Sequence, residues 1–308
     1  ASALIHKGVP KEELTSIRSM LTLERYQLIL RFFLDRNGGK SSPQVGYMAS
    51  FLKTVAKYWL KLDEEALQPF DKISRRLNQS NRGRGLTPKN RARLRPFDDP
   101  QMVQQFLELP FRIREDVEKD QKSPIKRRAL LAQRAAAIAI LQIMPVRRRN
   151  ISSTDMAENL VTRGKRLYLV FEGDETKNEE PVDLEFPPDR KDLIAWYVRE
   201  YRPHLLSEPN TALFPGEGGK PKGSGTLAAQ VKKVIKDYLG IDFNLHLFRH
   251  AGAKIYLDVR PGNYEVMRRV LSHRSINTTT STYTGAENKS AGLHFASVLG
   301  ERRASTDL

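Results

Sequence analysis

The sequence predicts a mostly α-helical protein with a small antiparallel β-sheet. Apolar residues recur every three or four positions through most of the chain, the spacing that places them on one face of a helix. Only two short runs, residues 167–171 and 181–186, are typical of strands, and the polar turn between them predicts a β-hairpin. With 308 residues, 39% of them hydrophobic, the chain is long enough for about two domains.

The first predicted domain is helical and covers residues 1–97. Residues 21–37 and 46–62 carry apolar side chains at helical spacing, and the turn sequence GGKSSP separates them. The last part of this domain is predicted to be a flexible basic linker, because it contains the loop-forming sequence QSNRGRGLTP.

The second predicted domain covers residues 98–290. It opens at Asp99-Pro100, where the aspartate suits a helix N-cap and the proline suits the first helical position. A long Ala/Leu/Ile-rich helix is expected over residues 126–143, and the hairpin follows it. Residues 291–308 begin apolar and end polar, which predicts a docking helix and a loose tail. Further helical patterns occupy residues 189–201, 227–239, 245–257 and 263–271.

The positive charge is concentrated in the N-terminal half. Lys and Arg number 52 against 36 Asp and Glu, a net charge of +16, and residues 1–150 hold 30 of the basic and 15 of the acidic side chains. Between Asp71 and Asp98 lie nine basic residues and no acid. Acids usually intersperse a merely solvated charge run, so we expect this stretch to contact a nucleic-acid backbone. The predicted DNA-binding residues are Arg75, Arg76, Arg82, Arg84, Lys89, Arg91, Arg93 and Arg95.

Composition also excludes several classes of protein. The chain has no cysteine, which removes disulfides, thiolate catalysis and cysteine-based metal sites. No apolar run approaches the roughly 18 residues that span a bilayer, and the first ten residues lack the apolar core of a signal peptide. We therefore expect a soluble, cytoplasmic protein associated with the nucleoid, with no membrane partner.

A cluster of histidines marks the candidate site. Asn244 predicts the N-cap of a helix on which His246 and Arg249, three residues apart, share a face. An anion placed there would meet a cation, an imidazole and free backbone amides. His273 follows downstream, and we expect His250 to be a structural histidine that bonds the backbone behind Arg249.

A metal site is the main alternative for this cluster. His246 and His250 have the spacing of helical zinc ligands, but Leu247 stands where the HExxH pattern needs a glutamate. No carboxylate lies nearby to complete a ligand set, and the chain has no P-loop pattern. We therefore expect no metal and no nucleotide cofactor.

Residues 246–285 resemble the closing motifs of the tyrosine recombinase (phage integrase) family. The three motifs of that family appear here in order as HLFRHAGA, LSHRSINTTT and TYTG. The resemblance extends over about residues 98–300, and the helical domain resembles the core-binding domain of the family more weakly. It implies an α+β catalytic domain. The matching positions are His246, Arg249, His273 and Tyr283, with Ser272 in place of the commoner glycine and Phe248 in place of the commoner leucine.

Two upstream residues extend the resemblance. The first arginine of the family follows a long apolar helix, and PVRRRNI resembles that motif with Arg147 at the arginine position. Asn150 stands where glutamate is usual, and the register among the three successive arginines stays open. The family's lysine lies in a hairpin turn, a place that Lys177 fits.

These residue types suit phosphodiester cleavage. Two guanidinium groups, from Arg147 and Arg249, can hold the non-bridging oxygens as they gain charge. Tyr283 is the predicted nucleophile, and the polar TTTST run before it predicts an exposed or movable segment. His246 is expected to take the phenol proton and His273 to bond the phosphate.

Lys177 completes the predicted site as the general acid that protonates the leaving 5′-oxygen. Three aromatic residues, Trp59, Tyr168 and Trp196, lie on apolar faces and are expected to pack in the core.

The resemblance implies a site-specific DNA recombinase or integrase of a mobile genetic element. Such an enzyme cleaves and rejoins double-stranded DNA through a 3′-phosphotyrosyl intermediate, without metal or ATP, and works as a homo-tetramer in a synaptic complex. Two alternatives remain: a type IB topoisomerase, and a catalytically silent DNA-binding protein of the same fold. The apolar segment after Tyr283 favours the recombinase, because it resembles the family's segment that docks on a neighbouring protomer.

Overall fold

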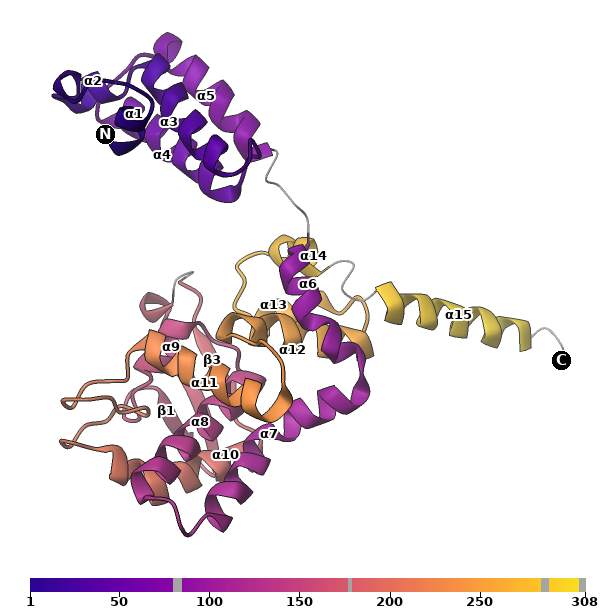
Figure 1. Ribbon diagram of the computed structural model, residues 1–308. Helices are drawn as coiled ribbons and strands as arrows, with labels where there is room; N and C mark the ends of the chain where they lie inside the picture. Colours follow the sequence, from indigo (N-terminus) through magenta and orange to yellow (C-terminus); the bar gives the residue numbers. More distant parts are fainter. Residues whose placement is uncertain (80–84, 177–178, 284–287, 305–308) are drawn as a thin grey trace. The chain divides into compact units, whose positions relative to one another are not determined.

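In the computed structural model the chain folds as two units, Ala1–Arg84 and Gly85–Leu308 (Figure 1). The structure describes residues 1–79, 85–176, 179–283 and 288–304. Residues 85–97, which the sequence analysis grouped with the helical domain, pack in the second unit, where Leu94 and Phe97 are buried in its core.

Polar caps start the main helices of the N-terminal unit. The hydroxyl of Thr22 accepts from the backbone N–H of Arg25 at 3.3 Å, and Ser42 caps the next helix ahead of a proline at its first turn. The buried Tyr26 joins three helices, because its hydroxyl donates to the carbonyl of Ala49 at 3.2 Å and its ring lies against Phe70. The helical segments are α1 (Ser2–His6), η1 (Lys11–Glu13), α2 (Ile17–Met20), α3 (Leu23–Arg36), α4 (Pro43–Tyr58) and α5 (Glu64–Gln79).

Most of the predicted flexible linker is helical, contrary to the sequence analysis. Arg75 and Arg76 lie on α5, whose apolar face packs in the N-terminal core through residues such as Phe70. Further basic residues lie on α6 (Pro88–Leu94), capped by the Thr87 hydroxyl, and on the 3-10 helix η2 (Arg95–Asp98). The dense charge obscured a few apolar positions that hold these helices in place. Arg82 and Arg84 lie outside the described residues.

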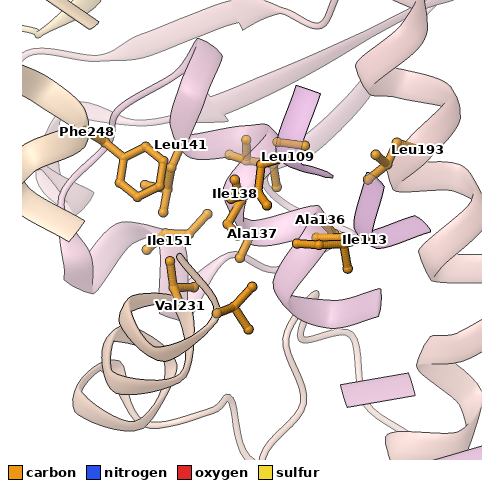
Figure 2. Packing of buried hydrophobic residues seen from close by; sticks show 14 of the residues in the cluster. Leu109, Ile113, Ala136, Ala137, Ile138, Leu141, Ile151, Leu193, Val231 and Phe248 are labelled. Carbon is orange, nitrogen blue, oxygen red and sulfur yellow. The ribbon is translucent and has the colours of Figure 1, made fainter. Parts of the chain in front are cut away.

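The core of the second unit is built around α8 (Ile125–Ile143). Its alanines are almost all inaccessible to solvent, and small side chains allow neighbouring helices to approach it closely. Figure 2 shows Ile138 and Leu141 of α8 in the same cluster as Leu109, Val231 and Phe248 from other helices. The α-helices that pack against α8 include α7 (Pro100–Lys119), α10 (Pro188–Trp196), α11 (Ser224–Leu239) and α12 (Leu245–Val259).

The second unit also contains the small antiparallel sheet, in the order β1-β2-β3. The predicted hairpin is confirmed, with β2 (Arg166–Phe171) paired to β3 (Val182–Glu185) and Leu169 opposite Leu184. The first strand, β1 (Leu160–Arg163), was not predicted. Leu169 and Phe171 are buried in the same core as the helix α8, so they anchor the sheet to it.

The helices predicted over residues 189–201, 227–239, 245–257 and 263–271 agree with the structure to within a few residues, and the cap of α7 at Asp99 is confirmed. The short helices at residues 148–153 and 276–283 were not predicted. Trp196 is buried as expected, but the prediction for Trp59 is wrong: this residue follows the end of α4 and is 71% exposed. Tyr168 is only half-buried. No described helix is long and apolar enough to cross a membrane. The other elements are α9 (Arg148–Ser153), η3 (Gly173–Glu175), η4 (Tyr197–Tyr201), η5 (Arg202–Leu205), α13 (Tyr264–Val270), α14 (Ile276–Tyr283) and α15 (Asn288–Ala304).

Candidate active site

A cavity of about 650 Å³ brings together four of the residues predicted from the sequence, Arg147, His246, Arg249 and His273. They come from the start of α9, from α12 and from the segment after α13. None of the described residues that line the cavity is acidic, and three are arginines, so this wall is cationic and suits an anion. The other lining residues are Val146, Arg148, Ala228, Asn244 and Leu245.

Arg249 is fixed at the base of this cavity. It is only 7% exposed, and its guanidinium donates to the carbonyl of Pro145 at 2.8 Å and to the carbonyl of Leu271. These two bonds tie α12 to the segments that carry the other arginine and the second histidine. Burial lowers the pKa of Arg249 to about 10, which leaves the group charged at neutral pH.

The first arginine of the site is Arg147, the residue that caps α9. It is half-buried, lines the cavity, and within the described residues has no carboxylate partner. Burial lowers its pKa. Arg148 also lines the cavity but is exposed, and Arg149 is exposed and does not line it, so the geometry favours Arg147 in the register left open by the sequence.

The two histidines of the cavity are positioned by different contacts. Asn244 caps α12 as predicted, accepting from the backbone N–H of Leu247 at 3.2 Å, and this sets His246 at the helix N-terminus. His273 has its Nδ1 2.9 Å from the hydroxyl of the buried Thr279. Burial lowers the pKa of His246 and lowers that of His273 to about 4, so both rings are neutral at pH 7.

Tyr283 is not in the cavity. It is 1% exposed at the end of α14, and its hydroxyl lies 3.0 Å from Nδ1 of His250 and 3.4 Å from the carbonyl of Arg249. Burial raises the pKa of the phenol to about 12. The prediction of an exposed segment is therefore wrong at Tyr283 itself, because its ring packs in a small core with residues such as Leu257 and Leu271.

His250 has a different contact from the one we expected. Its ring bonds the side chain of Tyr283, whereas the sequence analysis assigned it a backbone partner behind Arg249. Burial lowers the pKa of His250 to about 4. Tyr283 lies 33 residues after His250, and nothing in the sequence around His250 indicates a partner at that distance.

Sequence reasoning also missed the role of Asn150. Its side chain, on α9, donates to the carbonyl of Glu175 at 3.2 Å and so joins α9 to the loop between β2 and β3. Thr176, in that loop, lines a second cavity of only about 10 Å³ together with Arg147 and Arg249. Lys177 follows Thr176 in the sequence and lies outside the described residues.

Ser272, which replaces a commoner glycine, adopts a φ of +49°. This is the left-handed region that glycine enters without a steric penalty, so the backbone there is strained. Its neighbour His273 depends on this turn for its place in the cavity. In the described part of the chain, no group of three or more His, Asp or Glu side chains could hold a metal ion.

No protein-family model and no curated protein match the sequence. Solved structures do match. The Tn1549 transposon integrase bound to transposon right-end DNA gives a TM-score of 0.54 at 12% identity, over 97% of this chain and 92% of that one. The same integrase bound to circular-intermediate DNA gives 0.52 at 16% identity, over 94% and 87%. A lambda integrase tetramer bound to a Holliday junction gives 0.51 at 12% identity, over 90% and 67%.

The chain has the tyrosine recombinase fold. The predicted fold class, mostly helical with a small antiparallel sheet in the catalytic part, is thus confirmed. At this level of identity the likeness concerns the fold, so the chemistry of the site has to be argued from its own residues.

Proposed function

We propose that this chain is a site-specific DNA recombinase that cleaves and rejoins DNA through a 3′-phosphotyrosyl intermediate, without metal or ATP. One observation carries the proposal: on a recombinase fold, Arg147, His246, Arg249 and His273 line one cationic cavity. Tyr283 ends the short helix α14, which begins three residues after His273. The fold alone would not suffice, because one fold hosts many functions.

The arginines would stabilise the transition state. Cleaving a phosphodiester places negative charge on the non-bridging oxygens, and preorganised cations are most effective where that charge develops. Arg249 is held rigidly by Pro145 and Leu271, so it would need little reorganisation when the phosphate arrives. Arg147 has no carboxylate partner among the described residues and would complete the pair.

The remaining residues would move protons. The oxygen of Tyr283 would bond to phosphorus as the bond from phosphorus to the 5′-oxygen breaks, giving a 3′-phosphotyrosine and a free 5′-hydroxyl. His246, neutral at pH 7, is suited to take the phenol proton. If the Thr279 hydroxyl donates to Nδ1 of His273, the proton of that ring sits on Nε2 and is available to the phosphate. Lys177 remains our proposed general acid.

DNA binding would come from the basic helices that flank residues 80–84. Arg75 and Arg76 on α5 and Lys89, Arg91 and Arg95 on α6 and η2 are exposed. Arg93 is half-buried and paired with Asp242, so it would contribute less. Phosphate contacts of this kind provide affinity without sequence specificity.

Assembly would involve α15, the helix that ends the described part of the second unit, and we propose residues 291–308 as its docking segment. Its large apolar side chains are open to solvent, with Leu293 and Phe295 each 65% exposed and Leu299 54% exposed. A surface of this kind favours burial against another protein chain. A neighbouring copy in a tetramer on DNA is the partner we propose.

The burial of Tyr283 favours a second candidate, a catalytically silent DNA-binding protein with the same fold. A type IB topoisomerase is the third, since it would use the same nucleophile and arginines. These functions differ in their products. A recombinase joins two DNA sites, a topoisomerase only relaxes supercoils, and a silent protein does neither.

The test uses a supercoiled plasmid with two copies of the DNA that flanks the native gene. The proposal predicts recombinant junctions, detected by amplification and sequencing, and no junctions with Tyr283→Phe. Relaxation without junctions would favour the topoisomerase. Binding without either product would favour the silent protein.

A further inference from the structure

The helix that ends at Tyr283 is tied to other segments of the second unit by three hydrogen bonds. Thr279 is bonded to His273 and the Tyr283 hydroxyl to His250, both within the catalytic unit's own site. A third tie comes from the start of the unit: the backbone N–H of Gly85 donates to the carbonyl of Ser281 at 2.7 Å. The chain therefore contacts the last turn of α14 at the point where the second unit begins (Figure 1).

Leu86 strengthens this tie by packing. It is half-buried against the small core that contains Tyr283, Leu257 and Leu271, and also against the large core of the unit. Gly85 adopts a φ of +87°, and a Cβ there would lie 3.9 Å from the carbonyl oxygen of Thr282. That distance is an ordinary contact, so it is the positive φ that favours glycine here and lets the backbone turn toward α14.

The segment that follows Leu86, residues 87–98, is fixed to α12. Lys254 of α12, only 9% exposed at its side chain, binds Asp98 at 2.6 Å and Asp258 at 2.9 Å. Lys254 lies one helical turn beyond His250 on α12. This helix therefore contacts Tyr283 through His250 and the segment from Gly85 to Asp98 through Lys254. The helix α6 also contacts α12 directly.

Tyr283 lies outside the cavity that would hold the phosphate. A phosphate bound by Arg147 and Arg249 would lie in the cavity that these arginines line, and Tyr283 does not line it. Bringing the phenol oxygen there requires the end of α14 to move. Ser281 is two residues before Tyr283, so that movement would break its bond to Gly85 and pull the ring out of the small core against which Leu86 packs.

We propose that Gly85 and Leu86 form a latch that keeps α14 closed, so that Tyr283 is released only when the segment carrying the latch shifts. The inference rests on the proposed function, in which Tyr283 is the nucleophile. It goes further by assigning the control of that nucleophile to the start of the second unit.

DNA phosphate is the ligand whose chemistry fits the release. Exposed Lys89, Arg91 and Arg95 follow the latch within ten residues and would draw the segment toward a duplex. A cavity of about 380 Å³, lined by Leu86, Arg91 and Arg95 among others, leaves space beside the leucine. DNA binding would then shift the population from the closed to the open position of α14.

The test compares Leu86→Ala with Leu107→Ala, another half-buried leucine that packs only against the large core. Amide hydrogen exchange of the peptide that covers α14 is measured in both, without DNA. We expect exchange about tenfold faster in Leu86→Ala, because truncating the leucine removes packing that holds the helix closed, and no change at α14 in Leu107→Ala. Equal exchange at α14 in Leu86→Ala and the unaltered protein would overturn the latch.

A second experiment measures how fast the protein becomes covalently attached to a duplex with one site. A nick beside that site releases the cleaved end, so the adduct cannot be resealed. The latch predicts faster adduct formation in Leu86→Ala than in the unaltered protein, by about tenfold, with similar DNA affinity. Adduct at equal rates in both proteins would overturn the latch and leave the proposed function standing. If exchange at α14 is faster in Leu86→Ala but neither the variant nor the unaltered protein forms adduct, the packing of Leu86 would be supported and the proposed function rejected.

Discussion

Several residues of the site are held in states that folding disfavours. Ser272 has a left-handed backbone, Arg249 is a buried cation, and His250 and His273 are buried as neutral rings. Each of these lies beside the proposed phosphate cavity or beside Tyr283. Strain of this kind is common at functional sites, where the surrounding structure enforces it.

Ser272→Gly is expected to stabilise the protein. Glycine adopts a φ near +49° without the penalty that a Cβ brings, so the free energy of unfolding should rise by about 1 kcal/mol. Urea unfolding measures the change. The matched control is Gly240→Ala, at a φ of +72°, which should lower stability by a similar amount. A loss of stability in Ser272→Gly would show that the serine side chain matters more than the backbone.

Acid should destabilise the second unit before most carboxylates titrate. Burial lowers the pKa of His250 and of His273 to about 4, against about 6.5 in an unfolded chain. Between these values the unfolded state binds more protons, so the free energy of unfolding falls as pH drops from 6.5 toward 4. His250→Gln should make this slope shallower in urea unfolding from pH 7 to pH 4.5.

The control for this prediction is His204→Gln, because His204 is exposed. It should leave the pH dependence unchanged. A slope that is the same in His250→Gln and the unaltered protein would contradict the buried neutral ring.

At the scale of elements, four short segments build the site: the start of α9, the start of α12, the segment after α13 and the end of α14. The first three line the cavity, and the fourth holds the tyrosine outside it. The basic helices α5 and α6 carry the charge that we assign to DNA. The chemistry and the binding therefore belong to different elements, and separate variants can test them.

Neutralising the exposed cations of α6 and η2, by Lys89→Gln, Arg91→Gln and Arg95→Gln, should weaken binding to every duplex alike. Cations that neutralise DNA phosphates release counterions, so the slope of log affinity against log salt should fall by about 0.9 for each phosphate that is no longer neutralised. Fluorescence anisotropy over a salt series measures both effects. Binding and salt slope equal to those of the unaltered protein would mean that these cations only face solvent.

A matched control for the charge change uses exposed cations outside this stretch, at Arg112, Lys119 and Arg199. Replacing these three by glutamine lowers the net charge equally and should leave the salt slope unchanged.

Local patterns predicted these elements better than the contacts between them. The periodicity of residues 126–143 and the cap at Asn244 are local, so α8 and the start of α12 follow from the sequence. Strand β1 has its two apolar residues, Leu160 and Val161, next to each other, so it gives no alternating pattern. Tyr283 is buried with His250, Leu257 and Leu271, which are distant in the chain, and no local signal carries that information.

At the scale of the whole molecule, our proposals link DNA binding, release of the tyrosine and assembly. The N-terminal unit and the basic helices would bind the duplex, the latch would respond, and α15 would join neighbouring copies. The exposed apolar residues of α15 are the observation that supports assembly.

Deleting residues 291–308 should leave binding to a single site intact while abolishing synapsis and strand exchange on DNA with two sites. The deletion removes the apolar surface and leaves the cavity residues in place. Gel-shift assays with one-site and two-site DNA measure both effects. Normal assembly by the truncated protein would contradict docking through α15.

Point variants provide a control that keeps the helix. Leu293→Ser, Phe295→Ser and Leu299→Ser should reproduce the loss of synapsis, since they remove the apolar side chains alone. Ser297→Ala, on the same helix, should have no effect.

The central claim is that Tyr283 forms a covalent bond to DNA in a site that works without metal. The most direct measurement is digestion of the trapped protein–DNA adduct, formed in EDTA, followed by mass spectrometry of the peptide that carries the nucleotide. The account predicts a single modified residue, Tyr283, and no adduct from Tyr283→Phe, while Tyr256→Phe behaves like the unaltered protein. An adduct at another residue, or one that forms only after a divalent metal is restored, would contradict it.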